Sequence, residues 1–470
     1  MAVLDHNPEQ YFSREVDQKS RVLLINPPVQ ERRYHWLRWN QPTELLRLSS
    51  WLRVKHAGIG VRLFDFMFPD SSGSVSKHKV KETWGGSETD SQLWHFGRRF
   101  EEFEEYVSGM LLDDWIPDAI VVSSLTSYWH VSIEKLLIKL CTRLGRRVRQ
   151  AAKIILYGNY PRFEPEHAEN QPDADVALTR TVQTTNLLPD FGLYIDAERR
   201  PPNFYGLDVE SASLADHLDG CLEVQGGFDK ARGLSRPGTI TVSFLNDDIC
   251  SSSSHLEDVV AFAQSHPKRF VIEGIAGIEP RSLSCERLLQ LKNAGFRSLF
   301  VEHAREPGGD LDVAAYAPLL ELLGEEAHER KSGRNSNAWL DRGRVTGFVA
   351  IGLPDDEMDK IVRSTLKINQ FFQSIILKPY GYSPSIGRLS VEARRKRWRQ
   401  PWQSSPQCFP YLGRESGLVQ GDYENLLRWQ NVLNKRVKGT TFDFLDDGNV
   451  ARLVRETLMG ESWKRQEDPK

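Results

Sequence analysis

The sequence predicts two α/β domains, a doubly wound parallel sheet followed by a partial (β/α) barrel, with a helical region at the C-terminal end. Short apolar runs that end at Asn, Pro, Gly or Ser recur along the chain, and such runs are typical of buried parallel strands. Amphipathic stretches with apolar residues at helical spacing separate these runs. Because a stretch rich in Pro, Gly and charged residues divides the series, we expect two parallel sheets.

The first domain is predicted over residues 20–185. The run RVLLINPP at 21–28 indicates a buried strand that stops at Asn-Pro-Pro. A helix at 43–56 and a strand at 61–66 follow, and this order implies a right-handed crossover and a parallel sheet. The other predicted elements are a polar surface insertion at 68–105 with some helix at its end, strands at 119–124, 153–158 and 175–178, and a helix at 131–144.

The ends of these strands carry the first candidate site residues. Ligands of doubly wound sheets bind at the carboxyl ends of the strands. A glycine there lets a ligand approach the backbone closely. Small hydroxyl residues are either ligand contacts or the cap of the next helix, and both interpretations stay open. The candidates at these ends are Asn26, Pro27, Ser123, Ser124, Thr126, Ser127, Gly158 and Tyr160.

The second domain is predicted over 237–390, after an irregular linker at 186–236 that Pro, Gly and charged residues punctuate. Repeated strand–helix units without reversal indicate a full or partial (β/α) barrel. Its strands are expected at 239–245, 269–273, 298–302, 346–351 and 374–378, and its helices at 256–265, 284–294, 315–323 and 357–371. Residues 391–470 are predicted to be helical, and their basic run EARRKRWRQ is interpreted as a solvated helix face.

Two acidic residues follow the first predicted strand of the barrel. Asp247 and Asp248 stand at the carboxyl end of that strand, on the face where barrel enzymes keep their sites. They are the catalytic candidates, either as acid and base or as binders of a substrate cation. The alternative is that they are inherited with the fold and have no present use.

Composition excludes some classes of partner. The chain has 470 residues and a formal net charge of -3, from 61 basic and 64 acidic residues, so its overall charge favours neither nucleic acid nor an anionic membrane. No apolar run approaches the ~20 residues of a membrane-spanning helix. The N-terminal stretch lacks the features of a signal peptide, and a cytoplasmic location is expected. The expected partner is a small-molecule substrate or another protein.

The cysteines are scattered. The sequence has five, at positions 141, 221, 250, 285 and 408, and no two lie within four residues of each other. This spacing excludes the local CxxC and CxxxC pairs from which most zinc and cluster sites are recognised. We expect free thiols and no metal ligands.

Several motifs occur in one collinear order over residues 20 to 390. In the first domain they are LLINPP, WLRVKHAGIG, VRLFDF, PDAIVVSS, ILYGNYPRFEPE and DVALTR, followed by the bridge LLPDFGLY. In the second they are SFLNDD, IEPRSLSCERLLQLKNAGFRSLFVE, VTGFVAIGLPDDEMDKIVRSTL and LKPYGYSPSIG. In this order they resemble cobalamin-binding radical-SAM proteins. The resemblance implies a Rossmann-like cobalamin-binding domain followed by a TIM-type barrel of radical-SAM type.

The chain departs from the family at the iron–sulfur motif. The family holds a [4Fe–4S] cluster through CxxxCxxC, and the matching positions here are Cys221, Gln225 and Phe228. Gln and Phe supply no thiolate, so we expect a degenerate motif without a cluster, with Cys221 as its sole remnant. Rescue in space by another cysteine stays open. SAM binding is left open too, because Glu302, the candidate for the family's ribose contact, is out of register.

The resemblance also implies which residues would meet the corrin ring. The loop 31–40 is placed at its lower face, where Tyr34, His35 and Trp36 offer flat aromatic surface and His35 is a candidate cobalt ligand. The hydroxyl residues after the third strand would line a groove for the nucleotide tail and bind its phosphate. The alternative for the aromatic residues is ordinary packing between domains.

Three functions remain open at this stage. The first is cobalamin-dependent group transfer, of a methyl group for example, by non-radical chemistry, which makes the chain a methyltransferase-like transferase. The second is a non-catalytic pseudoenzyme or accessory partner of an active radical-SAM homologue. The third is a doubly wound domain that binds some other small ligand and no corrinoid.

Overall fold

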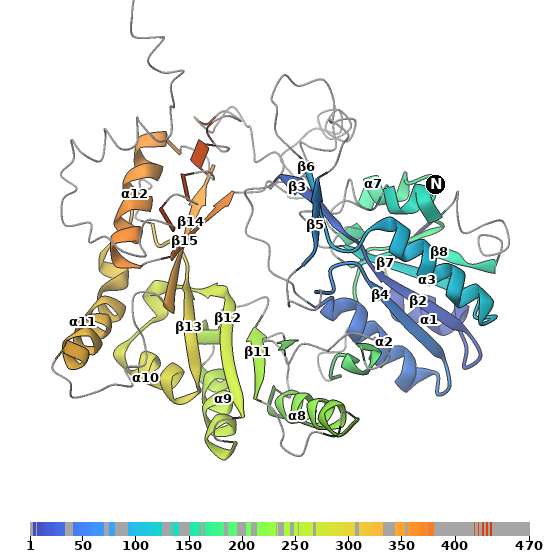
Figure 1. Cartoon of the computed structure of the whole chain (residues 1–470), viewed down its shortest axis with the longest axis horizontal. Helices are drawn as coiled ribbons and strands as arrows, with labels where there is room; N and C mark the ends of the chain where they lie inside the picture. The colour runs from blue at the N-terminus through green and yellow to red at the C-terminus, as the bar shows by residue number, and fades with distance from the viewer. Residues whose placement is uncertain are drawn as a thin grey trace, which may run out of the picture. The chain divides into compact units, whose positions relative to one another are not determined.

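The computed structural model describes residues 3–5, 7–32, 41–69, 75–79, 93–124, 133, 135–140, 151–158, 161–162, 165–182, 187–194, 204–207, 214–231, 233, 239–244, 249–251, 253–266, 269–305, 310–331, 344–352, 356–372, 374–379 and eight positions between 418 and 434. The chain divides into two units (Figure 1). The first comprises Met1–Gly206, Ser211–Gly238 and Gly381–Phe409, and the second comprises Leu207–Glu210, Thr239–Tyr380 and Pro410–Lys470.

The first unit contains the predicted parallel sheet. Its six strands run in the order β1-β9-β8-β7-β2-β4, and each of the strand pairs is parallel. The next strand of this sheet after β2 is β4, which pairs on one side of β2, and the strand after that is β7, which pairs on the other side. The chain therefore changes the direction in which it adds strands to the sheet. The switch point of the sheet therefore lies between β2 and β7. The strands are β1 (Val3–Asp5), β2 (Arg21–Asn26), β4 (Gly60–Asp65), β7 (Ala119–Ser124), β8 (Lys153–Gly158) and β9 (Val176–Leu178).

Both faces of this sheet are covered, which confirms that it is doubly wound. Leu23 and Ile25 of β2 pack in one core cluster with apolar residues of α3 (Phe100–Leu112). Val22 and Leu24 face the other way and pack with residues of α1 (Pro8–Glu15) and α2 (Thr43–Lys55). The alternation follows from strand geometry, because successive side chains point to opposite faces.

Two elements precede the predicted start of the domain at residue 20. Strand β1 pairs in parallel with β9 and extends the sheet by one strand. Helix α1 begins after Asn7, whose side chain accepts a hydrogen bond from the Gln10 backbone at 3.0 Å. The sequence did not predict β1 because three residues are too short for a periodic pattern, and its pairing partner lies far along the chain.

A three-stranded antiparallel sheet replaces part of the predicted loop and surface insertion. Its order is β3-β6-β5, with β3 (Val29–Arg32), β5 (Lys77–Lys79) and β6 (Leu93–Phe96). Gly97 follows β6 with a φ of 106°, and a Cβ there would lie 2.6 Å from the Phe66 carbonyl oxygen. Only glycine permits this close approach. The prediction of a loop at 31–40 is therefore wrong for Glu31 and Arg32, which belong to β3 and pair with β6 some sixty positions later in the chain.

The predicted linker at 186–236 contains regular structure. It includes the 3-10 turn η1 (Phe191–Tyr194), strand β10 (Phe204–Leu207) and helix α8 (Leu214–Ala231). The irregular-linker prediction is therefore wrong for these residues. The glycines within α8 hid the helix from sequence reasoning, because glycine disfavours helix interiors. At Gly220 the missing side chain makes room for Leu188, which would lie 2.5 Å from a Cβ there.

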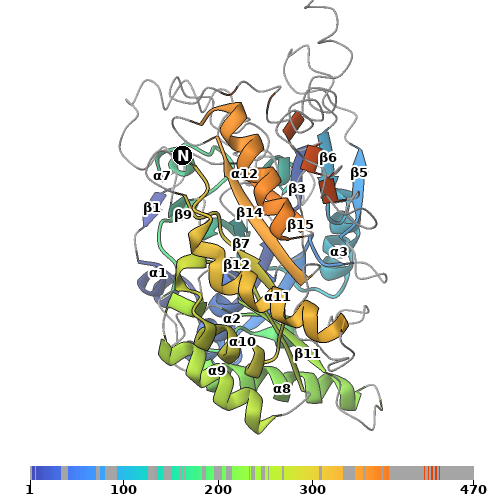
Figure 2. The ribbon, with the colours of Figure 1, turned by 90° about the vertical axis from the view of Figure 1, so that its left-hand side faces the viewer.

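The second unit contains another sheet, in which β11 to β15 pair in parallel in the order β11-β12-β13-β14-β15. Figures 1 and 2 show the helices that connect its strands on one face of it. The described strands follow one another in sequence order, as predicted, and the barrel curvature stays a prediction. The elements are β11 (Ile240–Phe244), α9 (Ser253–Ser265), β12 (Phe270–Ile278), α10 (Cys285–Asn293), β13 (Phe296–Val301), α11 (Ala317–Lys331), β14 (Val345–Ile351), α12 (Met358–Phe371) and β15 (Ser374–Pro379).

Two side chains from the C-terminal region cover the outer edge of β15. Gln430 accepts a hydrogen bond from the Leu377 backbone at 2.6 Å, and Asn434 both accepts from and donates to the backbone of Ile375. These amides satisfy strand groups that would otherwise form an open edge. Most of the predicted helical region 391–470 lies outside the described residues. Among the described helices, none combines the length and apolarity needed to cross a membrane.

Candidate functional site

The predicted strand-end residues meet at one edge of the first unit's sheet. Asn26 ends β2 and pairs in register with Asp65 at the end of β4. Ile25 of β2 pairs with Val122 of β7, so the residues that follow them in these parallel strands, Asn26 and Ser123, lie side by side. Ser124 pairs with Gly158, the last residue of β8. Four sequence-predicted residues, Asn26, Ser123, Ser124 and Gly158, therefore lie at the carboxyl edge on both sides of the switch point.

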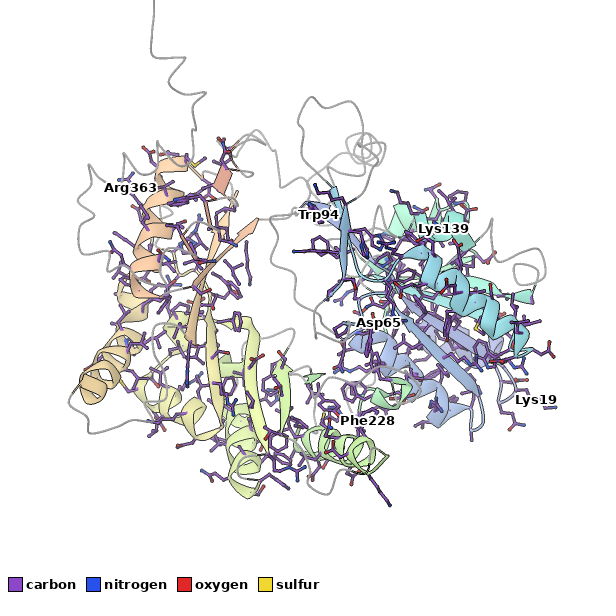
Figure 3. All side chains as sticks on the ribbon, in the orientation of Figure 1. Lys19, Asp65, Trp94, Lys139, Phe228 and Arg363 are labelled. Carbon is purple, nitrogen blue, oxygen red and sulfur yellow. The ribbon has the colours of Figure 1, made fainter. Side chains whose placement is uncertain are left out.

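Asp65 organises one half of this edge. It is 4% exposed and is labelled in Figure 3. Its Oδ1 accepts hydrogen bonds from Asn26 Nδ2 at 2.6 Å and from the Met67 backbone at 2.9 Å. Its Oδ2 accepts from the Tyr194 hydroxyl at 2.9 Å. Three donors compensate for the loss of water around this buried carboxylate. Asn26, a predicted ligand contact, thus also holds the end of β4.

The segment 187–194 brings Tyr194 to this edge. Asp190 Oδ2 accepts from Ser49 Oγ at 2.6 Å and pairs with Arg53 Nε at 2.7 Å, both on α2. The Tyr194 ring stacks on Phe68 with centroids 5.3 Å apart. Burial, and then the neighbouring Asp65 charge, raise the pKa of Tyr194 well above its ordinary value. The hydroxyl therefore stays protonated and remains a donor.

Glu44 organises the other half of the edge. It lies in the first turn of α2, and its Oε2 accepts from Ser123 Oγ at 3.4 Å. Gly158 has a φ of 86°, a conformation that glycine favours. A Cβ at this position would overlap Glu44 Oε2 and lie 2.7 Å from Ser123 Oγ. The glycine thus leaves room for a carboxylate above the end of β8.

Several predicted site residues lie outside the described part of the chain. Pro27 is described and buried, and Ser124 is described only as a strand residue. Those outside are Tyr34, His35, Trp36, Thr126, Ser127, Tyr160, Asp247 and Asp248.

Sequence reasoning missed Glu44, Asp65 and Tyr194 as members of this site. An acidic residue in the first turn is ordinary for any helix, so Glu44 carried no special signal. Asp65 carried a usable signal, because it ends the strand next to Asn26. Tyr194 is 129 residues from Asp65, and no local pattern reports such a contact.

The three positions that match the cluster motif lie on one buried face of α8. Cys221 is fully buried, and burial raises the pKa of its thiol. Gln225 accepts from the Tyr205 hydroxyl at 2.9 Å and donates to Asp229 Oδ1 at 2.8 Å. Phe228, labelled in Figure 3, is 5% exposed. This face forms a packed polar network with a protonated thiol, and it presents no group of thiolates.

The strand ends of the second unit carry an ion pair. Glu302 follows β13, and its Oε1 lies 2.6 Å from Lys378 Nζ on β15. The ammonium also lies 3.6 Å from the centroid of the Phe348 ring, a cation–π contact. Nearby, Arg305 pairs with the buried Asp356 at 2.7 Å. Within the described residues, no group of three or more His, Cys, Asp and Glu side chains is arranged to hold a metal ion.

No protein-family model matches the chain. No curated protein matches it either. Among solved structures it is similar to the radical S-adenosylmethionine methyltransferase TsrM from Kitasatospora setae with tryptophan substrate and the SAM analog aza-SAM bound, at 11% identity over 78% of this chain and 75% of that chain, with a TM-score of 0.44. The same methyltransferase with cobalamin and a [4Fe–4S] cluster bound is 10% identical over 77% of this chain and 72% of that chain, with a TM-score of 0.43. The cobalamin-dependent S-adenosylmethionine radical enzyme OxsB with aqua-cobalamin and S-adenosylmethionine bound gives 11% identity over 84% and 58%, with a TM-score of 0.41. TM-scores this low do not place the chain in a family.

Proposed function

We propose that the first unit binds cobalamin at the carboxyl edge of β2, β7 and β8. The observation that carries the proposal is the strand order, which puts the switch point between β2 and β7, where sheets of this class bind their ligands. Asn26, Ser123 and Gly158 lie at that point. The collinear motifs of the sequence supply the class of ligand, since they resemble cobalamin-binding proteins.

The described side chains fit a corrinoid. A corrin ring carries amide side chains, whose N–H groups need acceptors. Glu44 and Ser123 supply acceptor oxygens at the switch point. Gly158 has no side chain, and the space above the end of β8 is left to the oxygens of Glu44 and Ser123. When bound and reduced, cobalamin would supply a nucleophilic cobalt centre that can accept a methyl group from a donor and pass it on. The chain's residues would hold the ring by its amide edge and orient it.

We further propose that no [4Fe–4S] cluster forms at the positions of the family motif. Support comes from α8, where Cys221 is buried as a thiol and Gln225 is held by Tyr205 and Asp229. Without a cluster there, the chain lacks the family's electron source for cleaving SAM. Glu302 is engaged by Lys378, which gives no support for a SAM ribose contact. The function is then polar group transfer that uses an outside reductant.

The alternative is an accessory protein that binds the corrinoid without catalysis. Helix α8 favours this alternative, because Gln225, at a position where the family has a cluster ligand, is hydrogen-bonded to Tyr205 and Asp229. Methyl-transfer assays with a partner omitted or added separate the two. Transfer by the chain alone, with a chemical reductant, supports the enzyme. Transfer only with an active homologue supports the accessory role.

The first experiment is a UV–visible spectrum of the full chain after incubation with hydroxocobalamin and gel filtration, with iron measured on the same sample. Retained corrinoid absorbance is expected, with iron far below the four atoms per chain that a [4Fe–4S] cluster contributes. Loss of the corrinoid on the column would refute cobalamin binding. Iron at about four per chain would refute the absence of a cluster.

A variant pair links any retained corrinoid to the switch point. Gly158→Val places a branched side chain against Glu44 and Ser123 and should abolish retention. Gly109→Ala on α3 is the control, because a Cβ there meets no described atom within 4 Å. The control should bind like the unaltered chain. Circular dichroism of both variants shows whether the fold is kept. Equal retention by both would move the corrinoid elsewhere.

A further inference from the structure

We propose that the first unit has a second binding site, at the edge of its sheet opposite the switch point, for a small molecule that carries a phosphate group. The site is a pocket of about 460 Å³. Pockets that bind small molecules have volumes of roughly 300–1,000 Å³. The residues that line it are Asp17, Gln18, Lys19, Lys55, His56 and Ala57. The proposal does not depend on cobalamin binding.

Two loops that enter neighbouring strands form this pocket. One follows α1 and leads into β2, and the other follows α2 and leads into β4. Because β2 and β4 are parallel, both loops lie at the amino edge, where the Gly60 N–H donates to the Ser20 carbonyl at 3.0 Å. Figure 3 labels Lys19 at this edge and Asp65 at the carboxyl edge. The six residues of β2 span about 20 Å, so the pocket is separate from the switch-point site.

Two ammonium groups give the pocket its charge. Lys19 comes from the first loop, and Lys55 is the last residue of α2. Both side chains are exposed, and neither forms an ion pair with another residue of the described part of the chain. Lysine is a common binder of phosphate groups. The two ammonium groups can therefore approach one anion from two sides.

Asp17 carries the opposite charge, but its carboxylate is hydrogen-bonded within its own loop. Its Oδ1 accepts from the Lys19 backbone at 2.8 Å and from the Ser20 hydroxyl at 3.0 Å. These two hydrogen bonds, the Lys19 one first, lower the pKa of Asp17, so the carboxylate stays ionised at neutral pH and keeps its role as acceptor. It fixes the loop from which the Lys19 side chain extends. The lining still has two ammonium groups against one carboxylate.

His56 supplies a third donor. It is the C-cap residue of α2, is half-buried, and packs against the Trp51 ring with centroids 6.4 Å apart. Its Nε2 is buried and has no hydrogen-bond partner among the described residues. A buried polar atom without a partner is unfavourable. A small rotation of the ring toward the pocket would give an N–H at this atom a ligand oxygen as its acceptor.

Three donors from two loops suit a phosphate group better than a carboxylate. A phosphate group is tetrahedral, so its oxygens point in several directions, and it carries a charge of about −2 at neutral pH. A carboxylate is planar and carries a single charge. The alternative for Lys55 is that it only complements the negative end of the α2 dipole. That role needs neither Lys19 nor His56, so substitutions at these positions separate the two.

The test is a ³¹P NMR titration of inorganic phosphate against the full chain, at constant ionic strength and neutral pH. Saturable binding is expected, with a Kd on the order of 1 mM. Lys19→Gln and Lys55→Gln should each weaken binding about fivefold, the upper end for an exposed ion pair, and the double variant more than about tenfold. His56→Phe keeps an aromatic ring and should weaken binding about threefold or more.

Lys77→Gln is the matched control, because Lys77 is an exposed lysine of β5 and its loss changes the net charge equally. It should bind phosphate like the unaltered chain. Absence of saturable binding, or equal weakening by the control and the pocket variants, would overturn the site. Acetate that binds as tightly as phosphate would overturn the preference for a phosphate group. Corrinoid retention is measured separately, so either proposal can fail without the other. Thermal melting of each variant confirms that it is folded.

Discussion

Replacement of Tyr194 by Phe is expected to destabilise the first unit by about 2 kcal/mol. The change removes the hydroxyl that donates to Asp65 Oδ2 at 2.9 Å and keeps the ring that stacks on Phe68. A hydrogen bond to a charged group contributes roughly 1.5–3 kcal/mol. Asp65 keeps its donors from Asn26 and the Met67 backbone, so the loss should fall within this range and not above it.

Urea unfolding of the full chain at neutral pH measures this loss, with hydrogen exchange of β4 amides as a readout specific to the first unit. Tyr106→Phe on α3 is the control. The Tyr106 ring packs on Phe64 with centroids 5.0 Å apart, and its hydroxyl has no hydrogen bond among the described residues. The control should change stability by less than about 0.5 kcal/mol. Equal effects of the two substitutions would refute the role given to the Asp65 contact.

Three further predictions concern other parts of the chain. Stability should fall as the pH drops from 6.5 toward about 3, because burial and the Arg305 charge lower the pKa of His303 to about 3 and the unfolded chain takes up the proton first. The contribution of His303 to the slope is at most about 1.4 kcal/mol per pH unit, and His303→Phe should reduce the slope by that amount in a pH series of unfolding curves. Gly158→Ala should lower the free energy of unfolding by at least roughly 1–2 kcal/mol, because a φ of 86° is strained for a residue with a side chain. A urea midpoint equal to that of the unaltered chain would contradict this prediction. Gln225→Leu should lower the free energy of unfolding by about 1–3 kcal/mol, because the buried Tyr205 hydroxyl loses the acceptor that lies 2.9 Å from it. An unchanged melting temperature would contradict a stabilising role for this hydrogen bond.

The sequence predicted well those elements whose signal is local. The run at 21–28 indicated a buried strand, and β2 is buried on both faces. The helix predicted at 284–294 is α10, where the Ser284 side chain accepts from the Arg287 backbone at 3.2 Å. Apolar spacing and capping residues act over a single turn or strand, so they can be recognised without knowing the rest of the molecule.

Elements that depend on distant partners were missed. Strand β3 forms because β6 pairs with it, and the aromatic and basic sequence around it carries no alternating pattern. Helix α8 contains Gly220, which disfavours a helix on its own, and the contact with Leu188 turns the missing side chain into an advantage. Such contacts outweigh intrinsic propensity, and they exist only once the chain has folded.

The sequence by itself determined which residues end the parallel strands, because apolar runs that stop at Asn26, Ser123 and Gly158 can be recognised locally, and on this ground it predicted a ligand site there. Only the tertiary structure decided which side chains meet there. Glu44 and Ser123 are 79 residues apart, and Asp65 and Tyr194 are 129 apart. Periodicity reports the face on which a residue lies within its own helix or strand, whereas the charge of a site depends on which distant faces the fold brings together.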